Sequence, residues 1–214
     1  MDLISRALPL LIRGLGITVA LGVVSFAIGS VLGFLIALAR LSGARPVRFA
    51  AVTYVSVFRG TPLLVQILLI YFGLPQIGIR LEPIPSAILA LSLHAGAYLS
   101  ENFRSGFLAV DKGQWEAAFS IGMAYRRVLQ RIILPQAIRV VLPPVGSRFI
   151  SLMKDTSLAS VVTVVELTRV AEQVGSATFR YMEMFVIVAL IYWVVNTILQ
   201  IGQEVLERRL GRAY

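Results

Sequence analysis

Cysteine is absent from the 214-residue chain, histidine occurs once, and charged residues make up only 14% of it. The lack of cysteine excludes disulfides and thiolate metal sites, and a single histidine excludes a metal site built from several histidines. A soluble domain usually carries about 25% charged residues. A chain that is instead 57% hydrophobic cannot bury its apolar side chains in one water-soluble core. The composition therefore predicts a membrane protein.

The chain also lacks the residues for hydrolysing a nucleotide. A phosphate-binding loop ends in Gly-Lys-Ser/Thr, whereas the two lysines lie in Asp-Lys-Gly (Lys112) and Met-Lys-Asp (Lys154). No Ser/His/Asp grouping is credible, because His94 lies in a charge-free apolar segment. We expect no catalytic residues, metal site or cofactor in this chain. For His94 we favour a hydrogen bond between helices over contact with a substrate.

Long charge-free windows mark the predicted membrane spans. A transmembrane helix needs about 18 or more apolar residues, and four windows without a charged residue are near or above this length: 14–39, 60–79, 83–100 and 184–203. A fifth apolar stretch, about 140–165, contains Arg148, Lys154 and Asp155. We predict an all-α membrane protein with five spans, at about 15–40, 51–74, 84–106, 143–165 and 184–204. Glycines in the first span favour close helix packing.

Lysine and arginine predict the orientation, because they are enriched in cytoplasmic loops. With the N-terminus outside, twelve of the 20 basic residues fall on the inner side, five on the outer side and three within spans. The chain is therefore predicted to be N-out and C-in, and its net charge of +9 reflects topology rather than binding to nucleic acid. Residues 1–14 would form a short outer segment, 15–205 the transmembrane domain and 206–214 a basic inner tail.

The longest loop, about 107–142, is predicted to be helical. Polar and apolar residues alternate in pairs over 125–133, which is typical of a helix with one wet face and one apolar face. Gly122 suits a tight turn before this helix, and Pro135 is expected to limit it. One interpretation is an amphipathic helix that rests on lipid headgroups at the inner surface.

The spacing of residues in this loop supports a more specific interpretation. Glu116-Ala117-Ala118 is followed after three residues by Gly122, after nine more by Ile132, and after one more by Leu134-Pro135. This pattern resembles the EAA loop of importer-type ABC transporter permeases. The resemblance implies a short coupling helix that docks into a cleft on a separate ATPase subunit, which would hold ATP and Mg. The coupling residues would be Glu116, Ala117, Ala118, Gly122, Ile132, Leu134 and Pro135.

Further motifs extend the resemblance over about residues 10–205. Phe58–Gln66 reads FRGTPLLVQ and Lys154–Leu158 reads KDTSL, which are similar to signatures of polar amino-acid permeases. Leu74-Pro75-Gln76 and Glu82–Ser86 are similar to cystine-type members. The resemblance implies a permease subunit of an ATP-driven importer in the bacterial inner membrane. Its partners would be ABC ATPase subunits, an extracytoplasmic amino-acid-binding protein and a second permease, identical or paralogous.

Charges within the fourth span point to a substrate site. Ionisable residues in spans cost several kcal/mol and usually face a cavity or a partner. Arg148 and Asp155 are two helical turns apart and so share a face, with Ser151 between them. Asp155 would accept from the ammonium group of an amino acid, and Arg148 or a free backbone N–H would donate to its carboxylate. Alternatively, Asp155 pairs with Lys154 or Arg59, and Arg148 extends to the inner interface.

The remaining candidates lie beside this face or in the second span. Thr156 and Ser157 offer hydroxyl groups, Thr61 lies at an expected kink before Pro62, and Gln66 lies one turn beyond. Arg59 is also a candidate for the substrate pathway, although we favour a structural role for it.

An arginine at 148 would repel a cationic side chain and attract a second carboxylate. The expected substrate is therefore cystine or an acidic amino acid. A basic amino acid or an opine remains an alternative, as does a carrier that works without an ATPase.

Overall fold

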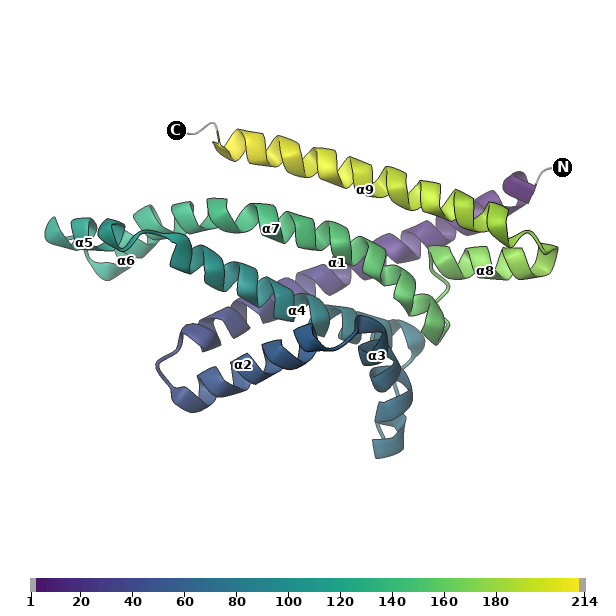
Figure 1. The fold of residues 1–214 in the computed structure, drawn as a ribbon, viewed down its shortest axis with the longest axis horizontal. Coiled ribbons are helices and arrows are strands. Elements are labelled where there is room, and N and C mark those ends of the chain that lie inside the picture. The colour runs from purple at the N-terminus through teal and green to yellow at the C-terminus, as the bar shows by residue number, and fades with distance from the viewer. Residues whose placement is uncertain (1–2, 212–214) are drawn as a thin grey trace.

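The computed structural model describes residues 3–211, and all regular structure within them is helical (Figure 1). In chain order the elements are α1 (Leu3–Leu41), α2 (Arg45–Gly60), α3 (Leu63–Leu68), the π-helical turn η1 (Leu69–Gly73), the 3-10 helix η2 (Leu74–Ile77), α4 (Pro83–Ala109), α5 (Lys112–Ser120), α6 (Tyr125–Val128), the π-helical turn η3 (Leu129–Ile133), α7 (Leu134–Asp155), the 3-10 helix η4 (Thr156–Val162), α8 (Leu167–Thr178) and α9 (Tyr181–Gly211).

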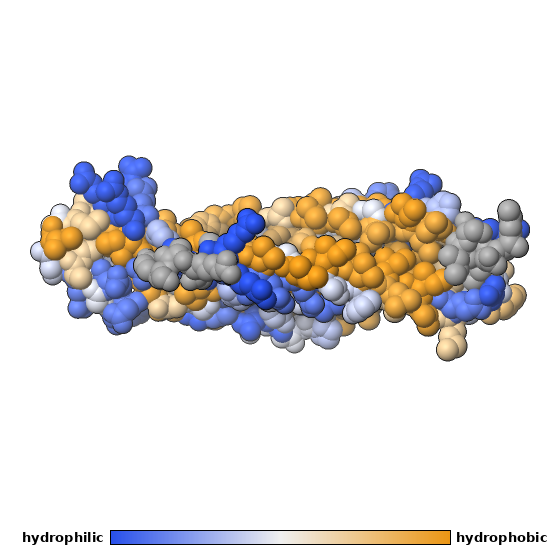
Figure 2. Space-filling view, turned by 90° about the horizontal axis from the view of Figure 1, so that it is seen from above, coloured by the Kyte–Doolittle hydropathy of each residue, from blue (hydrophilic) through white to orange (hydrophobic). Residues whose placement is uncertain are grey.

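The long helices run along the long axis of the molecule, with α5 and α6 at one end and α8 at the other (Figure 1). On the face seen in Figure 2, apolar surface forms a broad band along the middle, and polar surface lies toward both ends and along the lower edge. Three helical segments are long and apolar enough to cross a membrane, namely Arg6–Leu41, Tyr125–Val162 and Tyr181–Arg209. The bent pair Arg45–Gly60 and Leu63–Ile77 is a fourth candidate.

Helix α4 is the most enclosed element, and it is not among the three helices that are long and apolar enough to cross a membrane. Its buried face carries the polar residues Ser86, Ser92, His94 and Ser100 beside alanines and leucines. These side chains lower its apolar character, and α1, α2, α3 and α7 all pack against it. The predicted span 84–106 therefore corresponds to a helix at the centre of the fold.

Two glycines let α1 and α4 approach closely. A Cβ atom added to Gly29 would lie 2.9 Å from the Ala95 Cβ, and one added to Gly33 would lie 2.8 Å from the Leu99 Cβ. These distances are too short for any residue but glycine. The predicted role of glycine in helix packing is confirmed here, whereas at Gly16 an added Cβ would meet nothing within 4 Å.

The second predicted span, 51–74, is not one straight helix. The chain bends by 107° between α2 and the segment that begins with α3, so α3 and η1 run away from the long axis (Figure 1). Pro62 precedes α3, and its ring prevents the α2 hydrogen-bond ladder from continuing. The expected kink at Thr61 and Pro62 is thus a break that divides the segment into two helices.

The loop predicted at 107–142 is shorter in the structure, because Pro135 does not end a helix. Instead Pro135 occupies the first turn of α7, where a proline needs no backbone N–H partner. The π-helical turn η3 joins α6 to α7, so the chain is helical from Tyr125 to Val162. Helix α7 also contains Pro143 and Pro144. The surface segment is therefore confined to α5 and the turn that follows it.

Helix α8 was not predicted, although its pattern is present in the sequence. Leu167, Val170, Ala171 and Gly175 recur at helical spacing and are buried against α1 and α9. Glu166 caps the helix by accepting hydrogen bonds from the Thr168 and Arg169 N–H groups at 2.9 and 2.8 Å. Burial raises the pKa of the Glu166 carboxyl, while these hydrogen bonds lower it.

The terminal helices are longer than the predicted spans. Helix α1 begins at Leu3 rather than near residue 15, and Pro9 lies inside it. Helix α9 begins at Tyr181 and continues to Gly211, through most of the segment predicted as a tail. The rest of that tail, 212–214, and residues 1–2 of the predicted outer segment lie outside the described residues.

Candidate functional site

Arg148 and Asp155 lie together on one face of α7, as their spacing predicted. The Arg148 Nη2 donates to the Asp155 Oδ2 at 3.1 Å, and their side chains are 12% and 29% exposed. The guanidinium carbon of Arg148 also lies 4.6 Å from the centre of the Tyr98 ring on α4. Asp155 therefore pairs with Arg148, rather than with Lys154 or Arg59. This pair and the stacking on Tyr98 hold Arg148 within the protein, rather than at an interface.

The hydroxyl candidates on α7 and η4 are turned toward the local backbone. Thr156 donates to the Met153 carbonyl and Ser157 to the Lys154 carbonyl, both at 2.8 Å. Ser151 donates to the Ser147 carbonyl at 3.0 Å and lines a groove between α7 and α9. These oxygens keep lone pairs free to accept, but their hydrogen atoms are already used.

Gln66 holds the break between α2 and α3 together. Its Nε2 donates to the Phe58 carbonyl at 2.9 Å, to the Thr61 carbonyl at 3.1 Å and to the Thr61 Oγ1 at 2.9 Å. Its Oε1 lies 3.1 Å from the His94 Nδ1. The expected hydrogen bond between His94 and a neighbouring helix is therefore confirmed, and Gln66 is buried at the bend, whereas Thr61 is exposed beside it.

We expect Gln66→Ala to destabilise the bent segment. The substitution leaves the carbonyls of Phe58 and Thr61 and the His94 ring short of partners, and an unsatisfied buried group costs about 1–3 kcal/mol. A lowered midpoint of thermal unfolding in detergent would show this loss. The matched control is Gln76→Ala, at an exposed glutamine of η2. Equal midpoints for the two variants would contradict the structural role of Gln66.

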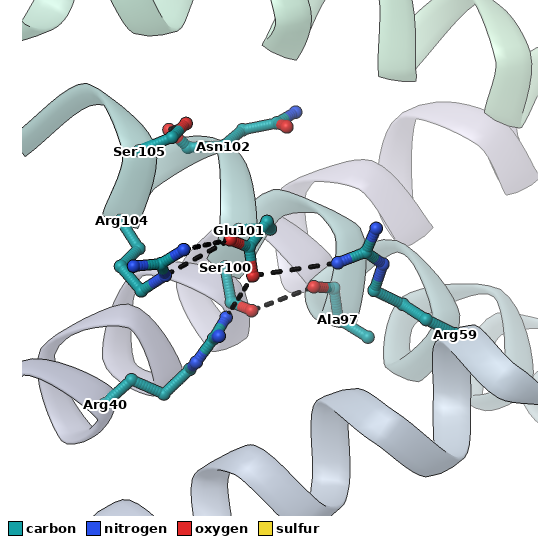
Figure 3. Close-up of polar contacts among 8 residues, drawn as sticks. All are labelled: Arg40, Arg59, Ala97, Ser100, Glu101, Asn102, Arg104 and Ser105. Atoms are coloured by element: carbon teal, nitrogen blue, oxygen red, sulfur yellow. Dashed lines mark hydrogen bonds and ion pairs between the residues drawn. The ribbon is translucent and has the colours of Figure 1, made fainter. Parts of the chain in front are cut away.

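A second ionic cluster connects α1, α2 and α4. The Glu101 carboxylate accepts from Arg40 and Arg104, and the Arg59 Nη1 lies 3.6 Å from its Oε2 (Figure 3). The Arg59 guanidinium carbon also lies 5.1 Å from the centre of the Tyr98 ring. Arg59 thus contacts Glu101 and Tyr98 within the protein, which agrees with the structural role that we favoured over contact with a substrate. One carboxylate faces three guanidinium groups, so the cluster retains excess positive charge.

Sequence reasoning did not single out Glu101 or Tyr98. Glu101 lies inside the predicted span 84–106. Because a charge within a membrane is costly, its position there could have indicated that Glu101 has a charged partner. Tyr98 follows His94 by four residues and precedes Glu101 by three, which places all three on one side of α4. Tyr98 lies between the Arg59 and Arg148 guanidinium groups and so connects the two ionic groups.

The coupling residues lie at the far end of the molecule from α8 (Figure 1). Glu116 and Ala117 are exposed on α5, whereas Ala118 is buried against Val128 and Ile133. Gly122 has a φ of +78°, which glycine adopts without strain. Ile132 lies in η3, and Leu134 and Pro135 begin α7. The predicted coupling motif therefore corresponds to a short exposed helix fixed to the base of α7.

Comparison with known proteins agrees with this arrangement. The family model described as "Binding-protein-dependent transport system inner membrane component" matches residues 29–212. The L-cystine transport system permease protein TcyB of Bacillus subtilis (strain 168) is 46% identical over 99% of this chain and 91% of the relative. The arginine transport system permease protein ArtQ of the same organism is 40% identical over 95% of this chain and 93% of the relative.

A solved structure shares the whole fold. The structure described as "Crystal structure of an amino acid ABC transporter with histidines" has a TM-score of 0.92 and 40% sequence identity, and the match covers 98% of this chain and 99% of that chain. The helical fold and the exposed segment at the base of α7 define a membrane transport component. The chain belongs to the family of binding-protein-dependent transport system inner membrane components.

Membership of this family confirms the expected function and excludes one of the alternatives. The chain is the permease subunit of an ABC amino-acid importer in the bacterial inner membrane, and it is the non-catalytic transmembrane component. A binding-protein-dependent ABC system works with an ATPase and a binding protein, so the carrier without an ATPase does not apply. The family acts without a cofactor, and the described residues contain no group of three or more histidine, aspartate or glutamate side chains placed to hold a metal.

Proposed function

We propose that the permease carries an amino acid with a second carboxylate or carboxylate-like end, such as cystine or an acidic amino acid. The observation that supports this most directly is the Arg148–Asp155 pair on α7, with 3.1 Å between Nη2 and Oδ2. Asp155 accepts from the ammonium group of the substrate, and Arg148 donates to a carboxylate. Cystine has no net charge at neutral pH, so it exchanges one ion pair for two without adding net charge to the site, which keeps the cost of burial low.

The hydrogen bonds of Arg148 leave a donor for this ligand. Among the described residues, the Arg148 Nε is buried and has no hydrogen-bond partner. A guanidinium group can bind a carboxylate with two parallel N–H donors, and the Tyr98 ring fixes its plane. Thr156, Ser157 and Ser151 lie next to this pair in the chain and offer oxygen acceptors. Arg59, Thr61 and Gln66 support the site from α2 and α3.

The relatives' names agree with a polar amino acid and leave its identity open. TcyB is named for L-cystine and ArtQ for arginine. The cation at residue 148 favours the cystine-like substrate, because a guanidinium group repels a basic side chain. Transport of a basic amino acid or an opine is the second candidate, and it is supported only by the arginine relative.

The proposed topology has five spans with the N-terminus outside. Its spans are 15–40, 51–74 broken at Pro62, 84–106, 143–165 and 184–204, within a transmembrane domain of residues 15–205. The excess of basic residues beside α5, at the end of α1 and in α9 supports an inner location for that end of the molecule. With this orientation, α5 reaches the cytoplasm and α8 lies at the outer surface.

The proposed assembly pairs this chain with a second permease and two ATPases. Exposed apolar side chains surround the coupling turn, where Phe119, Ile121 and Tyr125 are 45%, 77% and 63% exposed. Such a patch beside Glu116 and Ala117 fits a docking cleft on an ATPase subunit. Closure of the ATPases would move both coupling helices together and rock the spans between inward-facing and outward-facing states.

The substrate preference is tested by reversing the charge at residue 148. We expect Arg148→Glu to weaken binding of cystine or glutamate at least tenfold and to let arginine compete, because the site then presents two carboxylates. Competition binding to the purified permease–ATPase complex, without the binding protein, isolates this effect from the selectivity of that protein. Arg148→Lys keeps the cation and should keep the preference. An unchanged order of competitors in Arg148→Glu would reject the proposed substrate class.

A further inference from the structure

A second acid–base pair lies close to the Arg148–Asp155 pair and repeats its chemistry. Arg59 of α2 and Glu101 of α4 place a guanidinium group beside a carboxylate, with 3.6 Å between Nη1 and Oε2. The Tyr98 ring connects the pairs, because the guanidinium carbon of Arg59 lies 5.1 Å from its centre and that of Arg148 lies 4.6 Å from it. Each pair offers one anion and one cation, which are the groups that bind the ammonium and the carboxylate of one amino acid.

The contacts that give Arg59 its structural role use little of its hydrogen-bonding capacity. Its 3.6 Å contact with Glu101 is longer than a hydrogen bond, and a guanidinium group carries several N–H donors. The Arg59 side chain is 41% exposed, whereas that of Arg148 is 12% exposed. Arg59 also lies within a predicted span, where a charge usually faces a partner or a cavity. It therefore retains donors for a carboxylate of a ligand.

Glu101 is held in place by the other two arginines of its cluster. Arg40 and Arg104 donate to its carboxylate, and in Figure 3 Arg59 lies on the opposite side of Glu101 from Arg104. A carboxylate accepts up to about four hydrogen bonds. Glu101 can therefore exchange its long contact with Arg59 for an ammonium group and keep its other partners. The excess positive charge of the cluster attracts a carboxylate to the same place.

The distance across Tyr98 fits a ligand with two amino-acid groups. The guanidinium carbons of Arg59 and Arg148 lie at most about 10 Å apart, which is the sum of their distances to the ring centre. In cystine the two α-carbons lie about 4.4–6.8 Å apart and each carboxyl carbon is one bond of about 1.5 Å further out, so the carboxylates reach about 10 Å. The carboxylates of glutamate reach only about 5 Å, since three carbon atoms separate them. Cystine thus covers the whole of this range, and glutamate only its lower half.

From these observations we propose that Arg59 and Glu101 form a second subsite, which binds the second amino-acid group of a cystine-like ligand. The inference rests on the proposed function, in which the first amino-acid group binds at Arg148 and Asp155. Arg59 donates to the second carboxylate, Glu101 accepts from the second ammonium group, and the linker passes Tyr98. Each of the four charges of the ligand then faces an opposite charge, which offsets the loss of its water. The site therefore selects two linked amino-acid groups over a single one.

Two ligands that differ by one amino-acid group test this subsite. L-cystine carries both groups, whereas S-methyl-L-cysteine keeps one group and the adjoining sulfur atom. Dissociation constants for both ligands are measured on the purified permease–ATPase complex, without the binding protein. The unmodified protein is compared with Arg59→Gln, which removes the charge and keeps a polar side chain. Arg48→Gln is the matched control, at an exposed arginine of the same helix.

We expect the unmodified permease to bind L-cystine at least ten times more tightly than S-methyl-L-cysteine. Arg59→Gln should weaken L-cystine at least tenfold and change the affinity for S-methyl-L-cysteine less than about twofold, whereas Arg48→Gln should change neither affinity. Unchanged L-cystine binding in Arg59→Gln, or an equal loss for both ligands, would overturn the second subsite. Equal affinities for the two ligands in the unmodified protein would also overturn it, and that measurement does not depend on the folding of a variant.

The same ligands separate this inference from the proposed function. S-methyl-L-cysteine has one amino-acid group for the Arg148–Asp155 pair, so Asp155→Ala should weaken its binding whether or not Arg59 contacts a ligand. Loss of S-methyl-L-cysteine binding in Asp155→Ala, together with unchanged L-cystine binding in Arg59→Gln, would retain the proposed function and reject the second subsite. Unchanged binding of both ligands in Asp155→Ala would reject the proposed function, and the second subsite with it.

Discussion

Asp155→Ala is expected to abolish measurable uptake while the permease still assembles with its ATPase. A hydrogen bond to a charged group contributes about 1.5–3 kcal/mol, so loss of the acceptor should weaken amino-acid binding by about 10- to 150-fold. The removed carboxylate is the partner of Arg148 at 3.1 Å. Uptake is measured in proteoliposomes with the ATPase and binding protein, and assembly by the amount of ATPase that copurifies.

Controls separate a lost ligand group from a damaged fold. Removal of Asp155 alone leaves Arg148 without its partner, and an unpaired, partly buried charge destabilises a protein. The double variant Arg148→Ala/Asp155→Ala removes both charges and should fold well, yet remain unable to transport. Glu183→Ala removes an exposed carboxylate from a surface pair with Arg180 and should keep full uptake. Uptake by Asp155→Ala at the level of the unmodified protein would reject the site.

Gly122→Asp is expected to separate the permease from its ATPase. Gly122 has a φ of +78°, and no atom lies within 4 Å of a Cβ built there, so the substitution strains the backbone without an internal clash. The left-handed conformation costs most residues about 1–2 kcal/mol and aspartate less. The added carboxylate also places a negative charge on the exposed turn that follows α5. We expect copurified ATPase to fall at least tenfold.

Gly78 offers a matched control for this prediction. It has a φ of +89° and the same open surroundings, but it follows η2 at a distance from the coupling helix. Gly78→Asp should therefore introduce similar strain and retain the ATPase. Glu116→Arg should reproduce the effect of Gly122→Asp without any backbone strain. Normal substrate-stimulated ATPase activity in Gly122→Asp or Glu116→Arg would contradict the docking role of this segment.

Periodicity and spacing predicted the features that depend on one helix. The shared face of Arg148 and Asp155 follows from a separation of two turns, and the helix at Pro83–Ala109 follows from a charge-free window. The turn at Gly122 follows from the freedom of glycine to adopt positive φ. Each of these properties is encoded within a few consecutive turns of chain, so the sequence alone contains the signal.

The features that depend on several helices were not predictable in the same way. Gln66 stabilises the 107° bend through groups on three elements, and a local pattern at Thr61 and Pro62 indicates only that a helix is interrupted. Glu101 gathers arginines from α1, α2 and α4, which are distant in sequence. Pro135 was expected to limit a helix because proline interrupts a helix interior, whereas the structure places it in the first turn of α7, directly after the π-helical turn η3.

The central claim is that an amino acid binds between Arg148 and Asp155. Cryo-electron microscopy of the permease–ATPase complex with saturating cystine, without nucleotide, tests it most directly. We predict ligand density beside α7, with the ammonium group at the Asp155 carboxylate, a carboxylate at the Arg148 guanidinium, and Tyr98 behind it. Density at another place, with the Arg148–Asp155 contact intact at about its present 3.1 Å, would contradict the claim.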